Sequence, residues 1–165
     1  TRGVPPAGPY VAMASRLVRP TLFPGSAYAL PRMATILRGS VIQDGRPLRW
    51  PRILAKVEGT ASGIAHGDDR GEFVLVLEWK TLTAPPEDLD VSLTVRAVPR
   101  AMAPASDPGD RLADLVIEDV SRPLPTDTAL SGHALPPGYR DYNVPAPIKA
   151  TVGRLTEVGA IVFQP

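Results

Sequence analysis

Apolar and polar side chains alternate along several stretches of the chain, which is the pattern of strands with one buried face. The clearest alternation is VSLTVRA at 91–97, followed by FVLVLEWK at 73–80 and ILAKVE at 53–58. Weaker alternation predicts strands at 10–18 and at 33–42. Short strands that follow one another with turn residues between them indicate an all-β fold.

The last part of the chain predicts a hairpin and one ambiguous element. Residues 148–155 and 159–163 form the two arms of the hairpin, with a turn near Glu157–Gly159. At 111–120, the sequence RLADLVIEDV admits a helix capped by Asp110 or a strand through its Leu-Val-Ile run. We favour the strand because the neighbouring elements are all predicted to be β.

Proline separates these strands: 20 of the 165 residues are proline, more than twice the usual ~5 %. Proline removes a backbone donor and breaks helices and central strands, so long helical bundles are excluded. Three prolines lie in 1–9 and six in 121–147. We expect the first segment to be an extended arm. The second is a long loop, of a length that is often functional.

Two turns are indicated by their residue types. Asp44-Gly45 suits the positive φ angles of a tight hairpin turn. Residues 67–71 (GDDRG) form a second turn, in which Asp68 accepts hydrogen bonds from the backbone. The small and polar residues of 59–65 lie between these turns and end near a short strand.

Together these elements predict an antiparallel β-sandwich of seven or eight short strands, with long proline-rich loops and an extended N-terminal arm. The arm is 1–9, and 10–165 form a single sandwich domain. Its core lies at 33–98, with additional strands at 10–18 and within 111–163. An apolar fraction of 44 % and a net charge of +1 argue against a disordered chain.

The middle third carries a recognisable motif: a strand with Gly and Val, an Asp-Gly turn, Pro-Leu, a strand, and an Asp turn leading to Gly-x-Phe. The matching residues are Gly39, Val41, Asp44, Gly45, Pro47, Leu48, Val57, Asp68, Gly71 and Phe73. On these residues, 37–97 resembles the carboxypeptidase regulatory-like domain, a prealbumin-like (transthyretin-like) β-sandwich. Two positions depart from the family pattern: Gly67 replaces a Thr, which is expected to loosen the turn, and Pro51 stands where a small residue such as Ala is common.

The resemblance implies a scaffold and no particular chemistry, because such domains are accessory or assembly modules. Sandwiches of this kind with added arms and loops look similar to accessory proteins of phage-tail-like or contractile injection particles. The implied role is that of a non-catalytic structural or interaction subunit whose partners are other protein subunits.

Charge is divided unevenly along the chain although it nearly cancels overall. Residues 1–52 hold eight Arg and one acidic residue, giving +7, and 53–165 hold ten basic and sixteen acidic residues, giving −6. Such a division suits contact between one subunit's basic surface and a neighbour's acidic surface. The candidate contact residues are Arg16, Arg19 and Arg32. Nucleic-acid binding is disfavoured because few aromatic residues accompany these arginines.

No group of residues has the pattern of a catalytic or metal site. Ser62, His66 and Asp68 lie along one hairpin and do not predict a converging triad. The acidic run 68–72 contains an Arg and lacks the spacing of a calcium loop. Two histidines without cysteine disfavour zinc. We therefore expect no enzymatic activity and no cofactor.

Aromatic side chains supply the alternative hypothesis. Trp50, Tyr139 and Tyr142 are expected to be exposed and to offer stacking platforms for sugars, as in a carbohydrate-binding module. A calcium-stabilised adhesin-type domain is a third hypothesis. The chain has no apolar run of about 18 residues, so no membrane span is predicted. No signal peptide is visible, and the compartment stays open.

Overall fold

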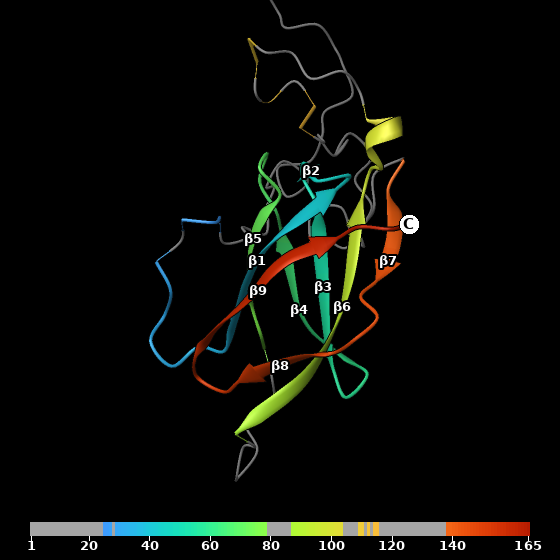
Figure 1. The fold of residues 1–165 in the computed structure, drawn as a ribbon. Coiled ribbons are helices and arrows are strands. Elements are labelled where there is room, and N and C mark those ends of the chain that lie inside the picture. The colour runs from blue at the N-terminus through green and yellow to red at the C-terminus, as the bar shows by residue number, and fades with distance from the viewer. Residues whose placement is uncertain are drawn as a thin grey trace, which may run out of the picture.

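The computed structural model describes residues 25–27, 29–78, 87–103, 109–110, 112, 114–115 and 138–165. The described residues form two sheets that face each other (Figure 1), so the predicted all-β sandwich is confirmed. Sheet A holds β1 (Ile36–Gln43), β2 (Arg46–Pro47), β5 (Glu72–Val76) and β9 (Leu155–Val162). Sheet B holds β3 (Arg52–Val57), β4 (Thr60–His66), β6 (Asp88–Ala97), β7 (Arg140–Asn143) and β8 (Ile148–Thr151). A short 3₁₀ helix, η2 (Arg100–Met102), follows β6.

β1 is the central strand of sheet A. It pairs antiparallel with β5 and with the short β2, and it pairs parallel with β9 along 36–42. The parallel pair departs from the purely antiparallel sandwich expected from the sequence. Since β9 is the last strand of the chain, this pairing brings the C-terminal residues beside the first described strand.

In sheet B, β6 has the longest run of paired residues. Along one edge it pairs with β3, which in turn pairs with β4. The other edge is divided between two short strands, with β8 opposite 88–91 and β7 opposite 94–97. Between them, the Val144 N–H donates to the Leu93 carbonyl oxygen over 2.9 Å. Pro145 and Pro147 separate β7 from β8.

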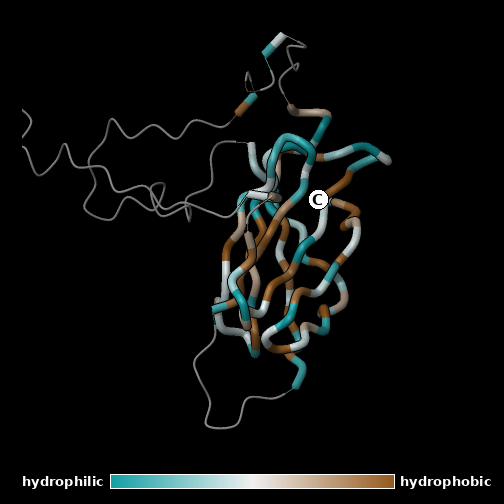
Figure 2. The backbone as a smooth tube through the Cα atoms, turned by 90° about the vertical axis from the view of Figure 1, so that its left-hand side faces the viewer, coloured by the Kyte–Doolittle hydropathy of each residue, from teal (hydrophilic) through white to brown (hydrophobic). Residues whose placement is uncertain are grey.

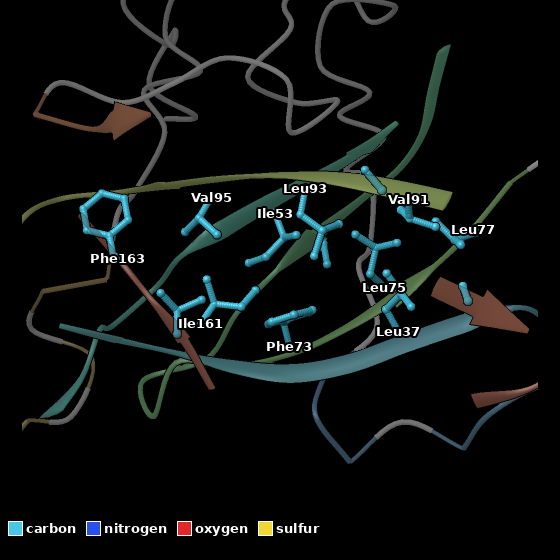
Figure 3. Packing of buried hydrophobic residues seen from close by; sticks show 14 of the residues in the cluster. Leu37, Ile53, Phe73, Leu75, Leu77, Val91, Leu93, Val95, Ile161 and Phe163 are labelled. Carbon is cyan, nitrogen blue, oxygen red and sulfur yellow. The ribbon is translucent and has the colours of Figure 1, made fainter. Parts of the chain in front are cut away.

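The alternating residues recognised in the sequence fill the space between the sheets (Figure 3). Figure 2 shows the same alternation as brown and teal steps along the strands. Buried hydrophobic side chains of both sheets form one cluster, which includes Leu37, Val41, Ile53, Phe73, Leu75, Val91, Leu93, Val95, Ile161 and Phe163. The parity predicted for 33–42, 53–58, 73–80 and 91–97 is therefore confirmed for the described residues.

Two strand pairs are joined by tight turns with positive φ at both central residues. Asp44 (φ 52°) and Gly45 (φ 70°) join β1 to β2, as the Asp-Gly signal predicted, and Pro47 follows in β2. Glu58 (φ 49°) and Gly59 (φ 76°) join β3 to β4. Such φ angles belong to hairpin turns whose twist matches that of the strands.

Gly39 is required by close packing at the centre of sheet A. It lies opposite Phe73 on one side and Gly159 on the other. A Cβ at this position would lie 2.8 Å from the Gly159 carbonyl oxygen and 3.1 Å from Cζ of Phe73. Only glycine leaves room for the aromatic ring and the neighbouring backbone.

The hairpin predicted from 148–155 and 159–163 is wrong. The chain turns at 152–154 and then enters sheet A as β9. β8 therefore pairs with β6 in sheet B, whereas β9 pairs with β1 in sheet A. Gly159 (φ 75°), which suggested a turn, lies at a β-bulge where the register with β1 shifts. A positive φ suits a bulge as well as a turn, and sequence does not distinguish the two.

Two strands were missed or underestimated. β4 covers 60–66 in full, although its small residues show little alternation. β7 lies inside the segment 121–147 that was predicted to be a loop; its polar sequence RDYN is stabilised as a strand by pairing with β6. The arm 1–9 and the strand 10–18 lie outside the described residues, as does most of 111–120.

The two glycines of the Asp-turn motifs give a test of the packing. Gly45 and Gly71 both have positive φ, but a Cβ at Gly45 meets nothing within 4 Å, whereas at Gly71 it would lie 2.5 Å from the Val41 carbonyl oxygen and 2.7 Å from that of Leu48. We expect Gly45→Ala to lower the free energy of unfolding by about 1 kcal/mol, the cost of the backbone conformation. Gly71→Ala should cost about 3 kcal/mol or more, because rigid backbone must also shift. Urea unfolding measures both, and equal losses would contradict the packing described.

Candidate functional site

β2 lies at the end of the sandwich drawn uppermost in Figure 1, and Arg49 and Trp50 follow it in the loop to β3. Here hydrogen bonds join the loop between β2 and β3, the 67–71 turn, residue 114 and the residue before β7. The residues that make these contacts, which we call the end cluster, are Arg49, Trp50, Asp68, Arg70, Asp114 and Tyr139.

Asp68 organises the turn, as its position in the motif predicted. Its Oδ1 accepts the backbone N–H groups of Arg70 and Glu72, each at 2.9 Å. Its Oδ2 accepts the Ser26 hydroxyl at 3.0 Å and an Arg70 guanidinium N–H at 3.2 Å. The Asp68 carbonyl oxygen accepts the Trp50 backbone N–H at 3.0 Å. The turn is therefore joined to the β2–β3 loop through the same residue.

The hydrogen bonds around Asp68 lower the pKa of its carboxyl group. Burial raises the pKa of the carboxyl, but the hydrogen bonds from the Glu72 and Arg70 backbone, from Ser26 and from the Arg70 side chain together hold it below its ordinary range. Because the pKa is lower in the folded state, the carboxylate contributes stability at pH values above its unfolded-state pKa of about 4. That contribution is lost as the pH falls through the folded pKa.

Asp114 receives three donors from the β2–β3 loop. Arg49 binds its carboxylate in a bidentate manner, with Nε at 2.5 Å from Oδ2 and Nη2 at 2.6 Å from Oδ1. The Trp50 indole N–H donates to Oδ1 at 3.0 Å. The Asp114 side chain is only 7 % exposed. Residues 65 positions apart in the sequence are thus held together by a geometry that aligns both partners.

The opposite charges of Arg49 and Asp114 stabilise each other. The hydrogen bond from Arg49 is the main reason that the pKa of Asp114 is lowered; burial opposes it, and the Trp50 indole and the Arg49 charge add to it. Arg49 also lies 5.4 Å from the centroid of the Trp50 ring, within the range of a cation–π contact. Its Nη1 is 3.9 Å from a carboxylate oxygen of Asp69.

Trp50 has a left-handed backbone conformation, with φ 55°. This conformation is rare for a bulky residue and persists only where surrounding contacts hold it. Here Asp68 accepts its backbone N–H, its carbonyl oxygen accepts the Tyr139 hydroxyl at 2.8 Å, and its indole donates to Asp114. The end cluster therefore holds the loop through three separate elements of the chain.

The aromatic residues expected to be exposed are used internally. Tyr139 is 8 % exposed and lies beneath Arg52, whose Cζ is 5.6 Å from the ring centroid, so its expected exposure is wrong. Tyr142 is partly buried and packs edge-to-face on Phe163, with centroids 6.0 Å apart. Trp50 is partly buried. The sequence did not indicate these contacts because each partner lies on a different element of the chain.

Of the three arginines proposed as contact residues, the structure describes only Arg32. Arg32 lies in the turn before β1 and is exposed, as a contact residue must be. Arg16 and Arg19 lie outside the described residues.

Two members of the disfavoured catalytic grouping, Ser62 and Asp68, have partners outside it. The Ser62 hydroxyl donates to the Thr60 carbonyl oxygen at 2.9 Å, and the Asp68 carboxylate is occupied by Ser26, Arg70 and Glu72. In the part of the chain that the structure describes, no three His, Asp or Glu side chains converge as metal ligands.

Arg49, Arg70 and Asp114 are the residues of the end cluster that were not among the site candidates from the sequence. Asp114 belongs to the ambiguous element at 111–120, and nothing in its neighbourhood signals a distant partner. The one available clue is that Arg49 and Trp50 are adjacent between two prolines, which constrains the loop that carries them.

Gly67 and Pro51 contact each other. The Gly67 N–H donates to the Pro51 carbonyl oxygen at 2.6 Å. A Cβ at Gly67 would lie 2.5 Å from Cγ of Pro51. The glycine therefore accommodates the proline ring.

No protein-family model and no curated protein matches the chain. Among solved structures, the chain is similar to a 9R-lipoxygenase from Cyanothece, with 12 % identity and a TM-score of 0.37. That match covers 79 % of this chain and 16 % of the lipoxygenase chain. No helix within the described residues is long and apolar enough to cross a membrane.

Acid should open the Arg49–Asp114 contact only well below neutral pH. Because the pKa of Asp114 is lowered in the folded state, the contact is fully formed above about pH 4 and is lost as the pH falls further. We expect the Trp50 indole N–H resonance, assigned with Trp50→Phe, to stay constant from pH 7 to about 4 and to move below it. Asp114→Asn should abolish this titration; its persistence in that variant would contradict the assignment.

The contact between Gly67 and Pro51 predicts strong coupling of two substitutions. Gly67→Thr alone should destabilise the fold, because the new side chain meets the proline ring. Combined with Pro51→Ala, which removes that ring, the same change should cost less by about 1–3 kcal/mol. A double-mutant cycle from urea unfolding measures the coupling, and additive losses would show that the two residues act independently.

Proposed function

We propose that the chain is a non-catalytic structural or interaction subunit of a multi-protein assembly. The Arg49–Asp114 contact carries this proposal. It joins Asp114, which follows β6 in the sequence, to the loop between β2 and β3, and Trp50 and Tyr139 add hydrogen bonds there. Binding segments are commonly presented from a rigid scaffold in this way.

The chemistry of the end cluster supports a structural role. The Asp68 and Asp114 carboxylates accept donors from their own neighbours, so they brace the loops and are not poised toward a substrate. A general base or nucleophile needs a partner arrangement that leaves the reacting atom accessible.

The assembly that we propose is a phage-tail-like or contractile injection particle. This context comes from the resemblance of 37–97 to the carboxypeptidase regulatory-like domain. Several motif residues have structural uses that suit such a scaffold: Gly39 admits Phe73, and Asp68 closes its turn.

A carbohydrate-binding role receives less support from the geometry. The Trp50 ring lies beside the guanidinium of Arg49. The Tyr139 ring lies beneath the guanidinium of Arg52. A sugar stacking on those ring faces would have to displace the arginine. A glycan array, with Trp50→Ala as the control, tests this second candidate.

The assembly role is tested by native purification of the tagged chain from its source cells. We expect the protein in a particle many times larger than its 17.6 kDa mass, with stoichiometric protein partners identified by mass spectrometry. Arg49→Met should reduce incorporation, because it frees the region around Asp114, whereas Arg154→Met, at an exposed arginine, should not. Recovery of the wild-type chain as a monomer alone would refute the proposal.

A further inference from the structure

Within the described residues, β9 is a strand at the edge of sheet A, and its outer side has no strand partner there. The Phe163 N–H donates to the Ile42 carbonyl oxygen, so Phe163 belongs to the ladder with β1. Because backbone direction alternates along a strand, the N–H and C=O groups of Ala160 and Val162 point away from β1. Nothing in the described part of the chain pairs with that side of β9.

The other outer strands of the C-terminal region carry charged residues, whereas the part of β9 beyond Gly159 carries neither charge nor proline. β7 carries Arg140 and Asp141, and β8 carries Lys149 after Pro147. Charges and prolines at edges are the usual protection against pairing with another chain. β9 has a single charged residue, Glu157, and no proline.

The bulge at Gly159 limits where a partner strand can pair. It interrupts the strand between Glu157 and Ala160, so the regular edge is the part beyond it. In that part Ala160 and Val162 are exposed, while Ile161 points into the core. A partner strand therefore meets small and β-branched side chains and no charge.

We propose that this edge pairs antiparallel with β9 of a second copy, about a two-fold axis at Ile161. Ala160 of each copy then faces Val162 of the other, and their outward N–H and C=O groups form two hydrogen-bonded pairs. The two A sheets become one continuous sheet. The inference rests on the proposed assembly role and names one of its partners.

The absence of charge on the β9 edge favours a second copy of the chain as its partner. An edge without charge selects a strand without charge, and β9 itself supplies one. With the axis at Ile161, Glu157 lies beyond the paired residues, so the two glutamates do not meet. The net charge of +1 adds little repulsion between copies.

Light scattering of the purified full chain tests the inference by measuring its molar mass at protein concentrations from about 1 µM to 1 mM. This range is needed because so few backbone hydrogen bonds give a weak dimer. We expect a concentration-dependent approach to twice 17.6 kDa. Val162→Pro removes an outward donor without touching the β1 ladder and should weaken dimerisation at least ~10-fold, since both copies lose a bond. Val162→Thr keeps the donor and should dimerise as the wild type does.

A second variant covers the case in which the proline disturbs folding. Ala160→Lys with Val162→Lys leaves the backbone intact and should also abolish the dimer, whereas Met102→Lys, another exposed apolar residue, should not. Hydrogen exchange of the Ala160 and Val162 amides should slow as concentration rises.

The inference is overturned by a monomer at 1 mM or by a dimer that all β9 variants retain. Protection of β9 by a different subunit in the native particle would also replace the second copy as occupant. If the native particle persists while the purified chain is monomeric, the assembly role stands and only this inference falls.

Discussion

The contact between Gly39 and Phe73 is the constraint on which the rest of the sandwich depends. A residue without a side chain at the centre of β1 lets the Phe73 ring lie flat against the backbone and lets the Gly159 carbonyl oxygen approach. The ring then fills the space between the sheets, where side chains of both sheets meet (Figure 3). Packing of this density tolerates few changes in volume.

The same contact shapes the C-terminal strand. Gly159 lies opposite Gly39, and the register of β9 shifts there. β9 runs parallel to the central strand, and in the described part of the chain its other side forms the edge of the sheet. The close approach that stabilises the core also determines which part of that edge is regular.

The upper end of the sandwich depends on a different kind of interaction. Carboxylates accept several donors each: Asp68 closes its own turn, and Asp114 binds a segment far away in the sequence. Trp50 is held in an unfavourable backbone conformation between them. The polar residues there are partners of one another, and they hold the loops at this end in place.

The sequence by itself determined the elements with strong local signals. Alternation identified the strands around 36–43, 52–57, 72–76 and 88–97, because burial of one strand face imposes a period of two. The Asp-Gly turn at Asp44 followed from the φ angles that such residues tolerate. Only the tertiary structure decided what depends on distant partners: the parallel pairing of β9, the short strand β7, the burial of Tyr139 and the Arg49–Asp114 contact. A glycine permits a bulge as readily as a turn, and a carboxylate accepts whichever donor the fold brings near, so the residues alone do not specify these partners.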